Sequence, residues 1–116
     1  MSRILLIDDD EDMIMLTGRW LEKAGYDVTK ATSGKEALDI LSGQKPDLIL
    51  LDYCMPEMDG PAVLKEIRTN DETKEIPVLY RTGMDDAVSG EYTANGIVSK
   101  SEGKPGLLKA LQEALA

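Results

Sequence analysis

The sequence predicts a doubly wound α/β domain, in which a five-stranded parallel sheet is covered by helices on both faces. Strand patterns alternate with helix patterns along the chain, as is typical of this class. Two strands are continuous apolar runs, Ile4–Ile7 and Leu48–Leu51, which indicates burial of both faces. They lead into Asp8-Asp9-Asp10 and Asp52. Because open α/β sheets bind ligands beyond the carboxyl ends of their strands, these acids predict one pocket for a hard cation and phosphoryl chemistry.

The five strands are short apolar or alternating segments separated by turn-forming residues. They are predicted over Arg3–Ile7, Tyr26–Ala31, Leu48–Leu51, Ile76–Thr82 and Gly96–Ser99. Pro77 lies near the start of the fourth strand, where a missing backbone donor is tolerated.

Helices are predicted between the strands and after the last one. The first covers Asp10–Ala24 and ends at Gly25, and its expected inward face has helical spacing: Met13, Leu16, Trp20 and Ala24. The others begin at recognisable start signals, namely a capping box at Ser33–Glu36, the run Asp59-Gly60-Pro61, and Pro105.

The stretch from Gly83 to Asn95 carries the weakest pattern. It is rich in glycine and polar residues, and only Val88 and Tyr92 are spaced to share a helix face. We therefore expect a short or irregular fourth helix there.

Composition limits the functions that this chain can have. Its 116 residues, 42% hydrophobic and 30% charged, predict one globular domain over residues 1–116. A net charge of −9 argues against direct nucleic-acid binding, and no apolar run has the roughly 20 residues needed to span a bilayer. A single cysteine, Cys54, favours a reducing cytoplasm. The absence of histidine excludes His-ligated zinc sites and histidine-dependent catalytic pairs.

Five features at successive strand ends resemble the receiver domain of two-component response regulators. They are the acid pair Asp8-Asp9, Asp52, the segment Met55-Pro56-Glu57-Met58-Asp59-Gly60, Thr82 and Lys100. The resemblance covers essentially the whole chain and implies the strand order 2-1-3-4-5.

The resemblance also implies a role for each of these residues. Asp52 is expected to be the phosphoacceptor, and Mg²⁺ to be bound by Asp9, Asp8, Asp52 and the backbone carbonyl of Cys54. Lys100 is expected to pair with Asp52 and then with a phosphoryl oxygen, while Thr82 bonds another such oxygen. The expected partners are a sensor histidine kinase or phosphotransfer protein, and a downstream protein target or output domain.

Two other functions are compatible with parts of the sequence. One is a receiver-like interaction module that does not use phosphate, because Ser101 stands where the family usually has proline and Ile97 where it often has Tyr or Phe. The other is a haloacid dehalogenase-type phosphatase with Asp8 as nucleophile, in which the Met55–Gly60 segment has no place.

Overall fold

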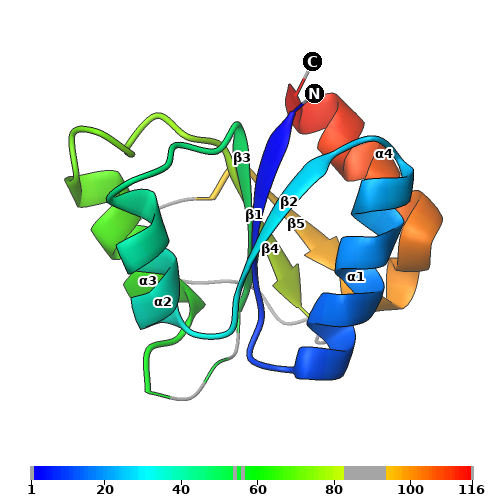
Figure 1. The fold of residues 1–116 in the computed structure, drawn as a ribbon, viewed down its shortest axis with the longest axis horizontal. Helices are drawn as coiled ribbons and strands as arrows, with labels where there is room; N and C mark the ends of the chain where they lie inside the picture. Colours follow the sequence, from blue (N-terminus) through cyan, green and yellow to red (C-terminus); the bar gives the residue numbers. More distant parts are fainter. Residues whose placement is uncertain (1, 54, 56, 83–93, 116) are drawn as a thin grey trace.

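A five-stranded parallel sheet forms the centre of the molecule, as predicted (Figure 1). The computed structural model describes residues 2–53, 55, 57–82 and 94–115. The strands lie in the order β2-β1-β3-β4-β5, which confirms the predicted topology. Their bounds are β1 Arg3–Ile7, β2 Asp27–Ala31, β3 Leu48–Asp52, β4 Val78–Thr82 and β5 Gly96–Ser99.

Helices cover both faces of this sheet. Helices α1 (Glu11–Lys23) and α4 (Gly103–Leu115) lie on one face, and α2 (Gly34–Leu41) and α3 (Gly60–Thr69) on the other. A short 3-10 helix, η1 (Lys100–Glu102), precedes α4. The expected short helix between β4 and β5 falls mostly on residues 83–93, outside the part that the structure describes.

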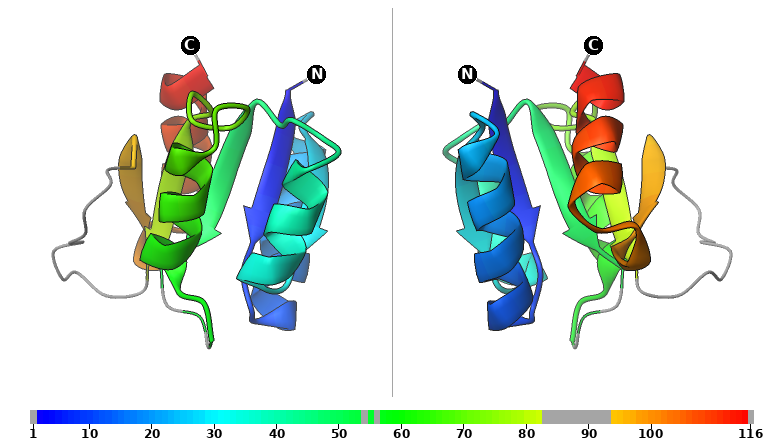
Figure 2. Two further views of the ribbon diagram at one scale, coloured as in Figure 1. Left: turned by 90° about the vertical axis from the view of Figure 1, so that its left-hand side faces the viewer. Right: turned by 90° about the vertical axis from the view of Figure 1, so that its right-hand side faces the viewer.

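The core consists of two apolar clusters, one on each side of the sheet. Leu5 and Ile7 of β1 pack toward α2 and α3, whereas Ile4 and Leu6 pack toward α1 and α4. This division follows from the period-2 alternation of side chains along a strand. The same alternation carries Asp8 and Asp52, one residue beyond Ile7 and Leu51, to the α1/α4 side. All strands point to one end of the sheet (Figure 2), and the acids lie at that end.

The predicted inward face of the first helix is correct only in part: Trp20 packs against the core, but the centre of the buried stripe is shifted. Its buried residues are Ile14, Thr17, Gly18 and Leu21, whereas Leu16 is 42% exposed. Thr17 can occupy a core-facing position because its hydroxyl accepts a hydrogen bond from the buried guanidinium of Arg81. The buried stripe of the helix thus includes a polar residue and a glycine, which the apolar pattern did not indicate.

Several element boundaries also differ from the predicted ones by one or two residues. Asp10 and Ala24 are the caps of α1 rather than helical residues. Strand β4 begins at Val78, because the amide of Ile76 bonds the carbonyl of Thr73 in the preceding turn. Helix α4 begins at Gly103 rather than Pro105, since a proline in the first turn lacks only an N–H that would have no intrahelical partner.

A polar clasp holds α3 against the start of β4 and the approach to β5. The guanidinium of Arg68 donates to the carbonyls of Lys74 and Ile76 and to Oδ1 of Asn95. The same Asn95 oxygen accepts a bond from the Val78 amide at 2.8 Å. These bonds fix the amino ends of β4 and β5, at the opposite end of the sheet from the acids.

In the described residues, each helix is too short or too polar to cross a bilayer.

Candidate functional site

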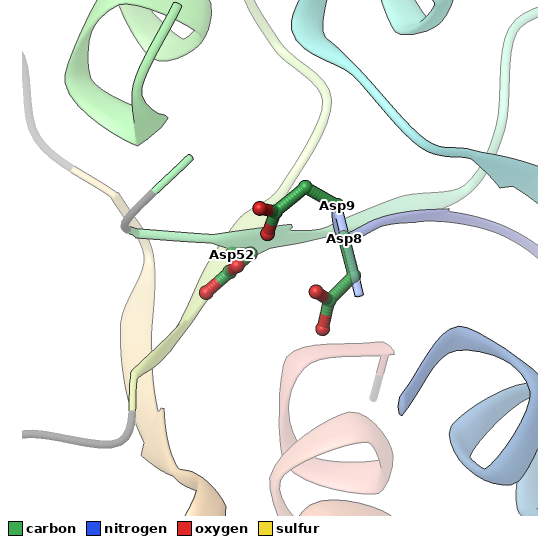
Figure 3. Close-up of side chains that lie close together, drawn as sticks. All are labelled: Asp8, Asp9 and Asp52. Carbon is green, nitrogen blue, oxygen red and sulfur yellow. The ribbon is translucent and has the colours of Figure 1, made fainter. Parts of the chain in front are cut away.

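Three carboxylates from β1 and β3 gather at the carboxyl end of the sheet. One oxygen from each of Asp8, Asp9 and Asp52 lies within 4.8 Å of the other two, and Figure 3 shows the three side chains around a common space. Asp8 and Asp52 are only 2% and 5% exposed, whereas Asp9 is exposed. The structure thus brings together the three predicted acids.

The acidic run after β1 divides into different structural roles. The Asp8 amide continues the ladder to Ala31 at 3.1 Å, and the Asp8 carboxylate accepts the Asp10 amide at 3.0 Å. Asp10 turns away as the N-cap of α1 and accepts the amides of Asp12 and Met13, a common capping arrangement. Asp9, between them, is left to project into the acidic pocket.

Lys100 supplies the cation that faces two of these acids. Its Nζ lies 3.3 Å from Oδ1 of Asp52 and 3.6 Å from Oδ2 of Asp8. The lysine begins η1, where a capping box joins Ser99 and Glu102: the Ser101 amide donates to the Ser99 hydroxyl, and the Ser99 amide donates to the Glu102 carboxylate. These local bonds hold the Lys100 turn without proline. Among the described residues no peptide bond is cis.

Thr82 ends β4 and is 6% exposed, beside Ser99 of β5 in the ladder. The predicted ligand Cys54 lies outside the described residues.

Burial and charge repulsion give Asp52 an unusual affinity for protons. The pKa of Asp52 is raised from 3.8 to about 7: burial is the largest cause, the neighbouring Asp8 carboxylate raises the pKa as well, and Lys100 partly opposes them. The lysine therefore compensates only part of the pocket's negative charge. A divalent cation with carboxylate ligands fits this all-oxygen donor set, and Mg²⁺ characteristically combines one or two carboxylates with water and phosphate oxygens.

The loop after Asp52 requires glycine at its end. The Gly60 amide bonds the Tyr53 carbonyl at 2.9 Å and closes the loop. A Cβ on Gly60 would come within 2.9 Å of the Asp52 carbonyl oxygen, the Tyr53 Cα and the Tyr80 ring. Close backbone approach beneath the acidic pocket thus explains the glycine that follows Asp59.

Sequence reasoning missed one charged residue near the site, Arg81. It is 2% exposed, and its Cα is paired with that of Asp52 between β4 and β3. The signal available in the sequence was a lone basic residue among the otherwise uncharged residues of Val78–Thr82.

The comparisons with known proteins agree with this geometry. Residues 4–112 match the family model described as "Response regulator receiver domain". The chain is 40% identical over 85 residues to the alkaline phosphatase synthesis transcriptional regulatory protein PhoP of Bacillus subtilis. It is 42% identical over 84 residues to the DNA-binding dual master transcriptional regulator RpaA of Synechocystis. These alignments cover 73% and 72% of this chain but 35% of each relative, so the chain matches about a third of their length.

A solved structure gives the same result for the fold. The chemotaxis protein CheY4 of Vibrio cholerae superposes with a TM-score of 0.89 at 31% identity, covering 99% of both chains. Strand order, the acidic end of the sheet and the match over residues 4–112 therefore agree. The chain belongs to the response regulator receiver domain family of two-component signalling.

Proposed function

We propose that Asp52 accepts a phosphoryl group from a phosphohistidine of a partner protein in a Mg²⁺-dependent reaction, and that this changes a protein-binding face of the domain. The observation that carries the proposal is the cluster of Asp8, Asp9 and Asp52 within 4.8 Å, with Lys100 reaching the acceptor at 3.3 Å.

In the proposed reaction, a carboxylate oxygen of Asp52 attacks phosphorus and forms an acyl phosphate. The bond between phosphorus and the donor's imidazole nitrogen breaks, and that nitrogen keeps the electron pair. Lys100 is already positioned beside Asp52 and balances charge on a phosphoryl oxygen. The Thr82 hydroxyl, at the end of the adjacent strand, is proposed to donate to another of these oxygens.

Asp9, Asp8 and Asp52 are the described residues that would hold Mg²⁺, and the Cys54 carbonyl remains a proposed ligand. When bound, the ion neutralises charge on the carboxylates and on the incoming phosphoryl group. The raised pKa of Asp52, about 7, explains why the site needs such a cation: without one, a large fraction of the acceptor carries a proton at neutral pH. A protonated carboxyl group is a poor nucleophile.

The proposed output is a two-state change read by another protein. Thr82 and Lys100 would bias the two states by binding the phosphoryl oxygens in only one of them. The donor is a sensor histidine kinase or a phosphotransfer protein, and the reader is a downstream target or output domain. We place the protein in the cytoplasm, because its single cysteine favours a reducing compartment. Direct contact with nucleic acid is not expected, because the net charge of the chain is −9. It acts as a phosphoryl acceptor rather than a multi-substrate enzyme.

Incubation with Mg²⁺ and acetyl phosphate, followed by intact-mass measurement, tests the proposal. A labile phosphoryl adduct is expected on the native protein, and none on Asp52→Asn or in the presence of a chelator. Asp10→Asn is the matched control, because it removes a neighbouring charge that caps α1 and lies outside the acidic cluster.

The other outcomes each correspond to a different function. No adduct on a folded, Mg²⁺-binding protein would refute phosphoacceptance and favour the phosphate-independent interaction module. Phosphate release that persists in Asp52→Asn would point to Asp8 chemistry of the phosphatase kind, which the family assignment does not support.

A further inference from the structure

A buried arginine lies directly beneath the acidic pocket. Arg81 is 2% exposed, and its place in β4 directs it to the α1/α4 side of the sheet, the side of Asp8 and Asp52. The Arg81 guanidinium donates to the Thr17 hydroxyl of α1 and lies 6.0 Å from the centroid of the Trp20 ring. Arg81 thus lies between the pocket and α1.

The bonding of this guanidinium is incomplete. Nε is buried without a hydrogen-bond partner, although arginine carries five N–H donors. Among the described residues, Arg81 forms no ion pair within 4.0 Å, and the ion pairs of the pocket are made by Lys100. Burial strongly disfavours a charged guanidinium, and the contacts with Thr17 and Trp20 offset only part of this cost.

The negative charges of Asp8 and Asp52 offset a further part of the cost of burying the Arg81 cation. Burial lowers the pKa of Arg81, and attraction to Asp8 and then to Asp52 opposes that effect. The two acids are therefore close enough to act on Arg81 through space. By reciprocity, its positive charge acts on whatever occupies the pocket.

We propose that Arg81 is a built-in counter-cation of the acidic pocket, which opposes Mg²⁺ electrostatically and links the pocket's occupancy to helix α1 through Thr17 and Trp20. The inference rests on the proposed function, since it takes this pocket to be the Mg²⁺ site.

The first consequence concerns metal affinity. Arg81 and Lys100 provide two positive charges against three carboxylates, so an arriving divalent cation meets a pocket that is already partly neutralised. An uncharged side chain at position 81 makes the net charge of the pocket and its surroundings more negative. Mg²⁺ is then expected to bind about tenfold more tightly, because charge interactions are poorly screened in a buried site.

The second consequence concerns helix α1. Mg²⁺ in the pocket repels the guanidinium, whose immediate contacts, Thr17 and Trp20, both belong to α1. Trp20 is the only tryptophan of the chain. Its emission is therefore expected to change when Mg²⁺ binds, and this change should depend on the cation at position 81.

Calorimetric Mg²⁺ titration at about pH 8, together with Trp20 fluorescence, tests the inference on the full chain. Arg81→Met removes the charge while keeping a long side chain, and Arg81→Lys keeps the charge as a control. Arg68→Met is the matched control for losing an arginine, since Arg68 is bound at the other end of the sheet. If Arg81→Met does not fold, Arg81→Gln replaces it, because its amide can still donate to Thr17.

The expected result is tighter Mg²⁺ binding and a lost fluorescence response in Arg81→Met, with native Mg²⁺ affinity and a native fluorescence response in Arg81→Lys and Arg68→Met. Equal or weaker Mg²⁺ binding by the uncharged variants would overturn the inference while leaving the proposed function intact. If the native protein binds no Mg²⁺, the proposed function fails. In that case, binding gained by the uncharged variants would still uphold the role of Arg81, and its absence would refute that role too.

Discussion

Replacing Asp52 by asparagine should change how stability depends on pH in the metal-free protein. In the folded protein Asp52 keeps its proton up to about pH 7, whereas in the unfolded chain it loses the proton near its ordinary pKa of 3.8. Between these values the folded state binds more protons than the unfolded state. The free energy of unfolding therefore falls as pH rises through this window.

The magnitude follows from the size of the shift. A difference of about three pKa units, at roughly 1.4 kcal/mol per unit, corresponds to a total loss of about 4 kcal/mol above pH 7. About 3 kcal/mol of this falls between about pH 5 and about pH 8. Asparagine has nearly the same shape and does not ionise, so Asp52→Asn should gain this amount over the native protein across that interval.

Denaturant unfolding of both proteins in the presence of a chelator measures the difference directly. Titrating groups distant from Asp52 contribute equally to the two profiles and cancel in their difference, which leaves the contribution of Asp52 and of the neighbours that interact with it. Adding Mg²⁺ at about pH 8 should stabilise the native protein much more than Asp52→Asn. Parallel pH profiles for the two metal-free proteins would show that Asp52 ionises normally and would refute the argument from burial and Asp8.

Three further predictions follow from the described contacts. Gly60→Ala should lower the free energy of unfolding by about 2 kcal/mol or more in denaturant melts because its Cβ would be crowded, whereas Gly43→Ala, which has open space, should be nearly neutral. Asp9→Ala should weaken Mg²⁺ binding in calorimetry because it removes a ligand, and unchanged affinity would remove Asp9 from the ligand set. Arg68→Met should cost about 2 kcal/mol in thermal or chemical unfolding, since the clasp to Asn95 and two carbonyls is lost; full native stability would contradict that role.

The fold could be predicted because its strongest signals are local and repeated. The runs Ile4–Ile7 and Leu48–Leu51 are nearly fully buried, and Ser33 and Asp59 cap their helices as expected. The predicted capping box at Ser33–Glu36 forms only in part, because the Glu36 carboxylate accepts the Thr32 amide rather than the Ser33 amide. The strand order came from family resemblance, because pairing partners are not encoded in any one segment.

The limits of prediction are clearest on α1, where the buried stripe contains Thr17 and Gly18. A threonine becomes a core residue only through a partner, here Arg81, that lies 64 positions away in the chain. For the same reason the site residues and the pairing of Lys100 with Asp52 could be predicted, whereas the remaining charge interactions of the pocket could not. The contact of Lys100 with Asp8 as well as Asp52, and the charge beneath them, require the folded sheet.

The register of the central strands has a consequence for folding. Strand β3 pairs with β4 so that Asp52 lies beside Arg81, and with β1 so that Leu51 lies beside Ile7. A slip by one residue would move Asp52 to the apolar side of α2 and α3, away from both cations. The charges of Asp52, Arg81 and Lys100 thus also raise the free energy of sheets with the wrong strand register. Replacing Asp52 by asparagine would therefore raise the stability of the metal-free native fold, as worked out above, while weakening the discrimination against misfolded chains.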